Sequence, residues 1–228
     1  MRIAEIYRSI QGEGLLTGTE SVFVRASGCN LRCWYCDTPF TSWSPEGDDL
    51  SVDEVTSRVL DLNAQHVVLT GGEPMLFAEL IPLSAALQAA GRHITIETAG
   101  TLYLPVVCDL MSISPKLANS TPTEEVAGKW KARHERVRHA PEVMHRLLRE
   151  YPYQLKFVID SLEDVEDVER YLIEFPEVDR SLVMLMPQGT DQASLVSRGE
   201  WLEPYCHQHG FQFSPRKHIE WFGFARGT

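Results

Sequence analysis

Six short runs rich in Val, Ile, Leu and Thr are spread along the 228 residues of the chain, and stretches with helical periodicity separate most of them. Several of the runs are almost continuously apolar, as strands are when both faces of a parallel sheet are covered. Such an alternation predicts a series of β-α units. The runs lie at residues 21–28, 66–70, 93–98, 108–114, 153–160 and 181–186.

Four stretches between or after these runs are predicted to form helices. The clearest begins with the capping-box pair Ser51 and Glu54 and carries apolar residues at helical spacing. The link at 100–107 is short and leaves room for only a turn or two of helix. The four predicted helices lie at residues 51–62, 77–90, 162–175 (capped by Ser161 and stopped near Pro176) and 191–209 (ended by Gly210).

The number of units bounds the fold class. A complete eight-unit barrel takes about 250 residues, so six units with extra segments fit this length better. We therefore expect an α/β fold, an incomplete (β/α)6-type barrel of mainly parallel strands with additional N- and C-terminal segments, with a doubly wound sheet as the alternative. One domain covering residues 1–228 is predicted, with the polar segment 117–140 as an insertion.

Charge and hydropathy exclude several classes of protein. The chain has 21 Lys and Arg against 32 Asp and Glu, a net charge of −11, so no nucleic-acid partner is expected. No apolar run approaches the roughly 18 residues that span a bilayer, and the first residues lack the apolar core of a secretory signal. These features predict a soluble, cytoplasmic protein with no membrane partner.

Three of the five cysteines, Cys29, Cys33 and Cys36, lie within eight residues directly after the first apolar run. An odd count with such a cluster favours a metal site in a reducing compartment over a disulfide framework. Thiolates select iron-sulfur clusters, zinc or copper(I), and three of them leave a fourth position open. A structural zinc site would need a fourth protein ligand. Cys108 and Cys206 are expected to be small apolar bystanders.

The spacing of these cysteines, with Tyr35 before the last of them, resembles that of the radical S-adenosylmethionine (SAM) family. The motif at residues 71–74, Gly-Gly-Glu-Pro, follows the second apolar run and matches the same family. The resemblance implies that Cys29, Cys33 and Cys36 hold a 4Fe-4S cluster in a radical SAM core domain. It further implies that SAM chelates the fourth iron of that cluster.

Further motifs resemble one branch of this family, the 7-carboxy-7-deazaguanine synthases. One departure is Ala99, because the branch more often has Asn at that position. The insertion at 117–140 matches no motif of the branch. The matching segments are residues 5–14 (EIYRSIQGEG), Gly18, Phe23, Arg25, 36–38, 97–101, 114–116, 186–189 and 214–219.

The resemblance implies a lyase that converts 6-carboxy-5,6,7,8-tetrahydropterin to 7-carboxy-7-deazaguanine with loss of ammonia, a step towards queuosine and related deazapurines. A 5′-deoxyadenosyl radical derived from SAM would abstract hydrogen from C6 of the pterin and recover it after rearrangement. The implied cofactors are a 4Fe-4S cluster, SAM and Mg²⁺. The implied partners are the pterin substrate, an electron-donor protein such as a flavodoxin or ferredoxin, and a second copy of the chain in a homodimer.

Residue roles are carried over position by position, and no catalytic residue separate from the cofactors is implied. Thr38 matches the residue whose hydroxyl helps to hold Mg²⁺. The positions that match substrate contacts are Ile10, Gln11, Gly12, Glu13, Arg25 and Thr70. The positions that match SAM contacts are Tyr35, Cys36, Asp37, Gly72, Ser114, Pro115, Lys116 and Gln188.

Arg25 can also be interpreted from its own surroundings. It lies inside an otherwise apolar strand, where an unpaired charge is costly. Its planar guanidinium suits a substrate carboxylate, and a structural ion pair is the competing explanation.

Two other functions compete with the synthase. A radical activase acting on a protein would share the cysteine loop but would not need the QGEG segment or Arg25. A zinc-stapled binding module without catalysis would account for the cysteines alone.

Overall fold

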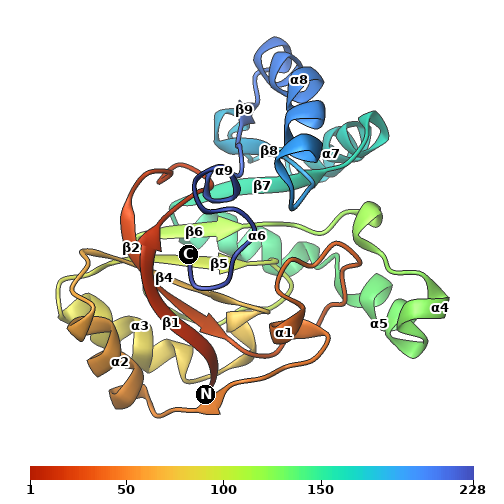
Figure 1. Cartoon of the computed structure of the whole chain (residues 1–228). Helices are drawn as coiled ribbons and strands as arrows, with labels where there is room; N and C mark the ends of the chain where they lie inside the picture. The colour runs from red at the N-terminus through yellow and green to blue at the C-terminus, as the bar shows by residue number, and fades with distance from the viewer.

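The computed structural model describes residues 1–228 and contains one nine-stranded sheet in the order β3-β1-β2-β4-β5-β6-β7-β8-β9 (Figure 1). β2 and β4 to β9 run parallel to one another, whereas β1 pairs antiparallel with both β2 and β3. The sheet is curved but open, so the incomplete barrel expected from the sequence is confirmed. The strands are β1 (Arg2–Ile10), β2 (Glu20–Ala26), β3 (Asp48–Asp49), β4 (His66–Gly71), β5 (His93–Thr98), β6 (Leu110–Ile113), β7 (Tyr153–Ile159), β8 (Val183–Pro187) and β9 (Gln212–Phe213).

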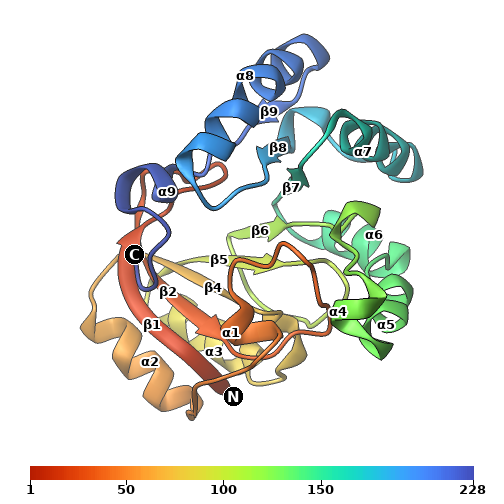
Figure 2. The same ribbon diagram turned by 45° about the vertical axis from the view of Figure 1, so that its right-hand side comes forward.

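Helices cover the outer, convex side of the sheet, and the C-terminal segment with α9 lies beside the β1-β2 hairpin (Figure 2). No helix of the chain is long and apolar enough to cross a membrane. The helices are α1 (Pro39–Ser42), α2 (Val52–Asp61), α3 (Leu80–Ala89), α4 (Glu124–Ala127), α5 (Lys129–Val137), α6 (Pro141–Glu150), α7 (Leu162–Glu174), α8 (Gln192–His209) and α9 (Lys217–Phe222), with 3₁₀ turns at Pro74–Leu76, Ala118–Ser120 and Arg180–Leu182.

All six predicted strands and all four predicted helices are present, with ends shifted by a few residues. The capping box of α2 is formed, because Ser51 N donates to Glu54 Oε2 (2.8 Å) and Glu54 N donates to Ser51 Oγ (3.2 Å). α8 ends at Gly210 in the left-handed conformation, as expected. Strand β1, helices α5 and α6 and the short elements α1, α4, α9, β3 and β9 were not predicted.

The link at 100–107, which is short enough to leave room for only a turn or two of helix, contains no helix. Pro105 and two valines disfavour a helix there. Side chains satisfy part of the backbone instead: Tyr151 Oη donates to the carbonyl oxygen of Val106 (3.1 Å), and Val107 N donates to Ser84 Oγ (3.2 Å). The chain therefore crosses from β5 to β6 as an extended, packed segment.

Side chains alternate along the parallel strands, and this alternation separates the core from the site. In β7, Leu155 and Phe157 are fully buried in the apolar core, whereas Lys156 borders the cavity on the concave side. β5 repeats the pattern with Ile94 and Ile96 in the core and Glu97 at the cavity. A period of two thus gives each strand an apolar outer face under the helices and a chemically varied inner face.

The predicted insertion, together with α6, forms the connection from β6 to β7 and packs against the cysteine loop (Figure 2). His134 of α5 is fully buried, and burial lowers its pKa to about 4, so its ring is neutral at pH 7. Its Nδ1 accepts a hydrogen bond from Arg32 N (3.1 Å), and its Nε2 donates to Ser120 Oγ (2.9 Å). The insertion therefore holds the backbone of the cysteine loop from outside.

Candidate active site

A cavity of about 540 Å³ lies at the carboxyl ends of the parallel strands, inside the curve of the sheet. In α/β folds, this end of the sheet is where binding and catalytic groups gather. Every residue to which the sequence analysis assigned a substrate, SAM or metal contact borders this cavity, with the exception of Pro115. Segments separated by up to about 200 positions in the chain, from Glu13 to Arg216, thus meet at one place.

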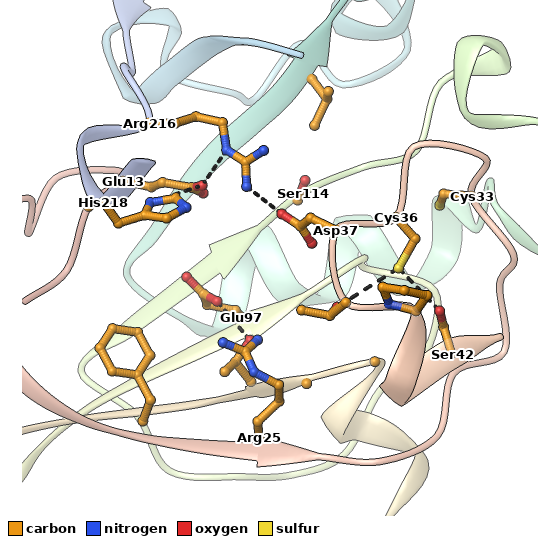
Figure 3. A pocket seen from close by; sticks show the side chains of 18 of the residues that line it. Glu13, Arg25, Cys33, Cys36, Asp37, Ser42, Glu97, Ser114, Arg216 and His218 are labelled. Carbon is orange, nitrogen blue, oxygen red and sulfur yellow. Dashed lines mark hydrogen bonds and ion pairs between the residues drawn. The ribbon is translucent and has the colours of Figure 1, made fainter. Parts of the chain in front are cut away.

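The three clustered cysteines lie on the loop between β2 and α1. Cys33 is buried, and Cys29 and Cys36 are half-buried; all three border the cavity. Cys36 Sγ lies 3.1 Å from Ser42 Oγ, at one side of the cavity (Figure 3). Burial raises the pKa of the Cys29 and Cys33 thiols to about 12. Thiolates at this place therefore require a bound cationic group to balance their charge.

The donor set fits an iron-sulfur cluster. Nowhere in the chain are three or more His, Cys, Asp or Glu side chains grouped to chelate a single metal ion. A cluster of several irons binds each cysteine at a separate iron, so it needs no such common point. Cys108 and Cys206 do not border the cavity.

Two glycines bring the turn after β4 against the start of the cysteine loop. A Cβ atom on Gly72 would lie 2.2 Å from the carbonyl oxygen of Gly28, and one on Gly71 would lie 2.1 Å from that of Ala26. Gly71 also has φ of +139°, which side chains rarely allow. Only glycine therefore fits at both positions, and the turn exposes bare backbone to the cavity.

Glu73 fastens the turn after β4 to the end of β5. Its fully buried carboxylate accepts hydrogen bonds from Met75 N (3.0 Å), Thr98 Oγ1 (2.9 Å) and Ala99 N (2.8 Å). Because Ala99 contributes its backbone N–H, this contact does not need the Asn that the branch more often has there. The buried carboxylate thus fixes two strand ends that border the cavity.

A network of buried charges closes the side of the cavity opposite the cysteines (Figure 3). Glu13 pairs with Lys156 of β7 and with Arg216 Nε (3.0 Å), and His218 Nδ1 lies 3.8 Å from Glu13 Oε1. Arg216 also pairs with Asp37 and donates to the carbonyl oxygen of Gly189 (2.6 Å). One guanidinium therefore joins the β1-β2 loop, the cysteine loop and the loop after β8.

Sequence reasoning assigned no role to Lys156 or Arg216. Lys156 carries the signal that drew attention to Arg25, a charged residue in an otherwise apolar strand, and could have been found by it. Arg216 lies in the matching segment 214–219, but that match gave no role to its side chain. Burial alone would raise the pKa of Glu13, but the charges of Lys156 and Arg216 outweigh it and hold that pKa well below its usual value.

Arg25 forms the structural ion pair that was the competing explanation. Its Nε donates to Glu5 Oε1 (2.7 Å) and its Nη2 donates to Tyr7 Oη (2.8 Å), both on β1. The charge of Arg25 is therefore paired within the chain, as the cost of an unpaired buried charge requires. Arg25 still borders the cavity, so the pair and a ligand contact are compatible.

The remaining predicted residues are held by local contacts. Gln11 Nε2 donates to Ser21 Oγ (2.8 Å), and Thr70 Oγ1 donates to Glu97 Oε2 (2.7 Å). Burial lowers the pKa of Lys116, whose Nζ donates to Ser114 Oγ (2.7 Å). The others, Ile10, Gly12, Tyr35, Thr38 and Gln188, also line the cavity.

The C-terminal residues line part of the cavity. Residues 224–228 line it, and Arg226 Nε pairs with Glu5 Oε2 (3.0 Å). The Arg226 guanidinium also lies over the ring of Phe40, 3.9 Å from its centroid. The tail is thus tied to both β1 and α1.

Comparison with known proteins places this fold and cysteine loop in a class. Residues 23–172 match the model of the Radical SAM superfamily. The chain is 43% identical to the 7-carboxy-7-deazaguanine synthase of Rhodopirellula baltica, over 99% of this chain and 88% of the relative. It is also 43% identical to the synthase of Halobacterium salinarum, over 99% of this chain and 92% of that relative. The chain is a radical SAM enzyme, and it belongs to the 7-carboxy-7-deazaguanine synthase family.

A solved structure supports the fold independently. The chain superimposes on the crystal structure of QueE from Escherichia coli with a TM-score of 0.70 at 22% identity, covering 94% of this chain and 92% of that one. Streptococcus suis SuiB bound to S-adenosylmethionine shares the fold more distantly, with a TM-score of 0.55 over 82% of this chain and 48% of that one.

Replacing Glu13 by Gln should destabilise the protein, because it leaves the buried Lys156 without a counter-charge and leaves Arg216 with Asp37 as its one acidic partner. We expect a loss of about 3 kcal/mol in the free energy of unfolding at pH 7, measured by urea denaturation. The folded-state pKa of Glu13 is depressed, so its stabilising effect is present above the unfolded carboxyl pKa of about 4.3 and is lost as pH falls below it.

The difference between the parent and the Glu13→Gln variant should therefore shrink in acid. Glu20→Gln is the matched control, because Glu20 pairs with Arg8 at the exposed surface, and it should change stability little. Equal effects of the two substitutions would contradict the importance of the buried network.

Proposed function

We propose that the protein converts 6-carboxy-5,6,7,8-tetrahydropterin to 7-carboxy-7-deazaguanine with release of ammonia, as a step in queuosine or related deazapurine biosynthesis. The observation that carries the proposal is that one cavity joins a three-cysteine loop at one side to a group of cations at the other. Family membership over nearly the whole chain supports the same activity. It also favours the synthase over a protein activase or a zinc-stapled module.

Cys29, Cys33 and Cys36 would hold a 4Fe-4S cluster, and SAM would lie beside it. Bound there, the cluster and SAM supply the radical that abstracts hydrogen from the substrate. The bare backbone at Gly72 can approach SAM closely, since no side chain intervenes. Lys116 and Asp37 offer opposite charges for its carboxylate and amino groups. Tyr35, Ser114, Pro115 and Gln188 complete the proposed set of SAM contacts.

The pterin would lie between SAM and the network around Glu13. The edge of a pterin needs both donors and acceptors, which Gln11, Glu13 and Thr70 can supply. Arg25 can offer its remaining N–H donors to the substrate carboxylate without leaving Glu5. Ile10 is the last residue of β1, and Gly12 lies in the loop that follows, where a Cβ atom on Gly12 would lie 2.4 Å from the backbone nitrogen of His218. The β1-β2 loop thus fits closely against the C-terminal segment.

Burial of the substrate is the second task of the protein. Residues 224–228 and the strand ends surround the cavity, so a bound pterin would be shielded from water. Exclusion of water protects a reactive radical from side reactions and strengthens charge interactions at the site. The tail, tied by Arg226 to Glu5, is the segment that would have to open for exchange of substrate and product.

The proposal extends to three further family properties. Thr38, directly after Asp37, would help to hold Mg²⁺, which prefers oxygen ligands and keeps several waters. The active form would be a homodimer. A flavodoxin or ferredoxin would supply the electron needed for each activation.

Turnover tests the proposed activity directly. Anaerobically reconstituted protein, reduced with dithionite and given SAM and carboxytetrahydropterin, should release ammonia and form a product with a deazapurine absorption spectrum. SAM should not be consumed in proportion to product. Slow cofactor cleavage that does not depend on the pterin would contradict the proposal.

Each cysteine of the loop should be required for the cluster. Cys29→Ala, Cys33→Ala and Cys36→Ala proteins should lose the visible absorption of the cluster and most of their iron, because three thiolates are its only proposed protein ligands. Cys206→Ala is the matched control, since Cys206 is buried, as Cys33 is, but lies in α8 away from the cavity. Iron retained after loss of a loop cysteine would refute the assignment.

Arg25 should act on the substrate and not on the cluster. An Arg25→Ala protein should keep its iron but show a KM for the pterin raised about tenfold or more, the scale of a lost charged hydrogen bond. Arg25→Lys should recover little, because a point charge cannot make the same planar contacts. If the Arg25→Ala protein had an unchanged KM for the pterin and a lower free energy of unfolding, Arg25 would serve only as the ion-pair partner of Glu5.

A further inference from the structure

The strongest concentration of positive charge in this acidic protein is on α5. Residues 129–138 contain five of the 21 Lys and Arg residues of the chain and a single acidic residue, Glu135. Lys129, Arg133 and Arg136 are exposed and follow a spacing of four and three residues, so they share one face of the helix. We call these three residues the α5 stripe.

The positive charges of the α5 stripe are not paired with the acidic residue of the same helix. Glu135 is engaged elsewhere, by Arg138 Nε (3.0 Å) and by Thr121, and Arg138 reaches inward to the carbonyl oxygen of Lys116 (3.3 Å). The other nearby acidic residues, Glu124 and Glu125, lie on the preceding short helix α4. The stripe therefore presents a local positive surface on a protein whose net charge is −11.

The α5 stripe is connected to the cysteine loop through the side chain of Trp130. Trp130, on the inner side of α5, has two guanidinium groups near its ring, that of Arg32 at 3.9 Å and that of Arg133 at 4.7 Å from the centroid. Arg32 is the residue before Cys33 on the cysteine loop. One indole thus joins a residue of the stripe to the neighbour of a proposed cluster ligand.

The cysteine loop itself exposes a large aromatic side chain. Trp34, between Cys33 and Tyr35, is 51% exposed. Its Nε1 donates to the carbonyl oxygen of Asn119 (2.7 Å), which holds the ring at the surface beside the insertion. Exposed Trp and Arg side chains are the residue types that carry most binding energy in protein interfaces.

We infer that the α5 stripe and Trp34 form the docking surface for an acidic one-electron donor protein. The inference rests on the proposed function, which requires an electron at the group held by the three cysteines. Docking here would allow the reduced flavin or iron-sulfur group of the donor to pass one electron to the group held by the three cysteines. The donor group would be oxidised by one electron, and the group held by the cysteines would be reduced by one. No bond forms or breaks in that step.

The charge distribution favours this partner over other anions. A nucleic acid or an anionic membrane presents an extended negative surface, which the acidic remainder of the chain would repel. A small acidic protein can match a patch of three cations and one indole. Complexes between redox partners are small and transient, and electrostatic attraction chiefly sets their rate of association and their salt dependence.

The test uses the cluster-loaded protein and a purified flavodoxin as the probe. A Lys129→Glu/Arg133→Glu/Arg136→Glu variant should bind flavodoxin about tenfold or more weakly than the parent, measured by titration at low ionic strength. Binding by the parent should weaken as salt is raised. An Arg58→Glu/Arg149→Glu/Arg170→Glu variant is the matched control, with the same change in net charge at three exposed arginines on α2, α6 and α7.

Turnover with two reductants separates docking from chemistry. Flavodoxin-supported turnover should fall in the α5 variant in step with binding, while dithionite-supported turnover and iron content should equal those of the parent. A Lys129→Gln/Arg133→Gln/Arg136→Gln variant should give an intermediate loss and guards against misfolding caused by charge reversal. Failure of the dithionite-reduced parent to form product would contradict the proposed function, whereas the binding titration would still test the docking surface.

Three results would overturn the inference. The first is unchanged flavodoxin binding by the α5 variant, and the second is an equal loss in the control. The third is a parent that binds neither flavodoxin nor an acidic ferredoxin. Stripe-dependent binding of duplex DNA or phosphatidylserine vesicles, in place of these proteins, would assign the surface to another class of partner.

Discussion

The ion pairs of Arg216 are the contacts on which the arrangement of the site depends most. The sheet is open, so its two ends are not joined by strand pairing. The β1-β2 loop is held to the C-terminal segment by a backbone hydrogen bond from Lys217 N to the carbonyl oxygen of Gly12 (2.9 Å) and by side chains. Arg216 does this through Glu13, Asp37 and the carbonyl oxygen of Gly189. Buried ion pairs contribute little net stability compared with apolar packing, but their geometry is demanding. Their value here is positional, because one planar group orients three loops around the cavity.

The alternation of side chains along the strands explains how a stable core and a reactive cavity share the same short segments. Ile94, Ile96, Leu155 and Phe157 pack beneath the outer helices and contribute the apolar burial. Their neighbours on the inner face do not contribute to that core and can vary in chemistry. A change of register by one residue in β7 would exchange Lys156 with an apolar side chain, so the same packing that stabilises the sheet also fixes the site.

Much of the fold could be predicted from the sequence because the parallel strands and long helices have strong local signals. Strand β1 could not, since it is an antiparallel strand near the sheet edge with mixed exposure and lacks an apolar run. The conformation of the short link at 100–107 could not be predicted either, because side chains from α3 and from Tyr151 at the end of α6 satisfy its backbone, which is a tertiary effect. Most candidate site residues were named from motifs, and Arg216 lies within one. The ion pairs of Lys156 and Arg216 with Glu13 could not be predicted, because each joins residues more than a hundred positions apart.

Positive charges occur in this acidic protein both in the buried site and on the exposed surface. The net charge of −11 describes the protein surface as a whole. The cations discussed above lie in two settings, one buried and one exposed, which differ in how strongly dissolved salt screens them. Lys156 and Arg216 are buried and paired with Glu13 and Asp37, so the surrounding salt screens them little. The cations of α5 are exposed, and their influence reaches about one Debye length into solution. An acidic protein can therefore hold an anionic small molecule inside and attract an acidic protein outside, because each interaction is decided by local placement of charge and not by the total.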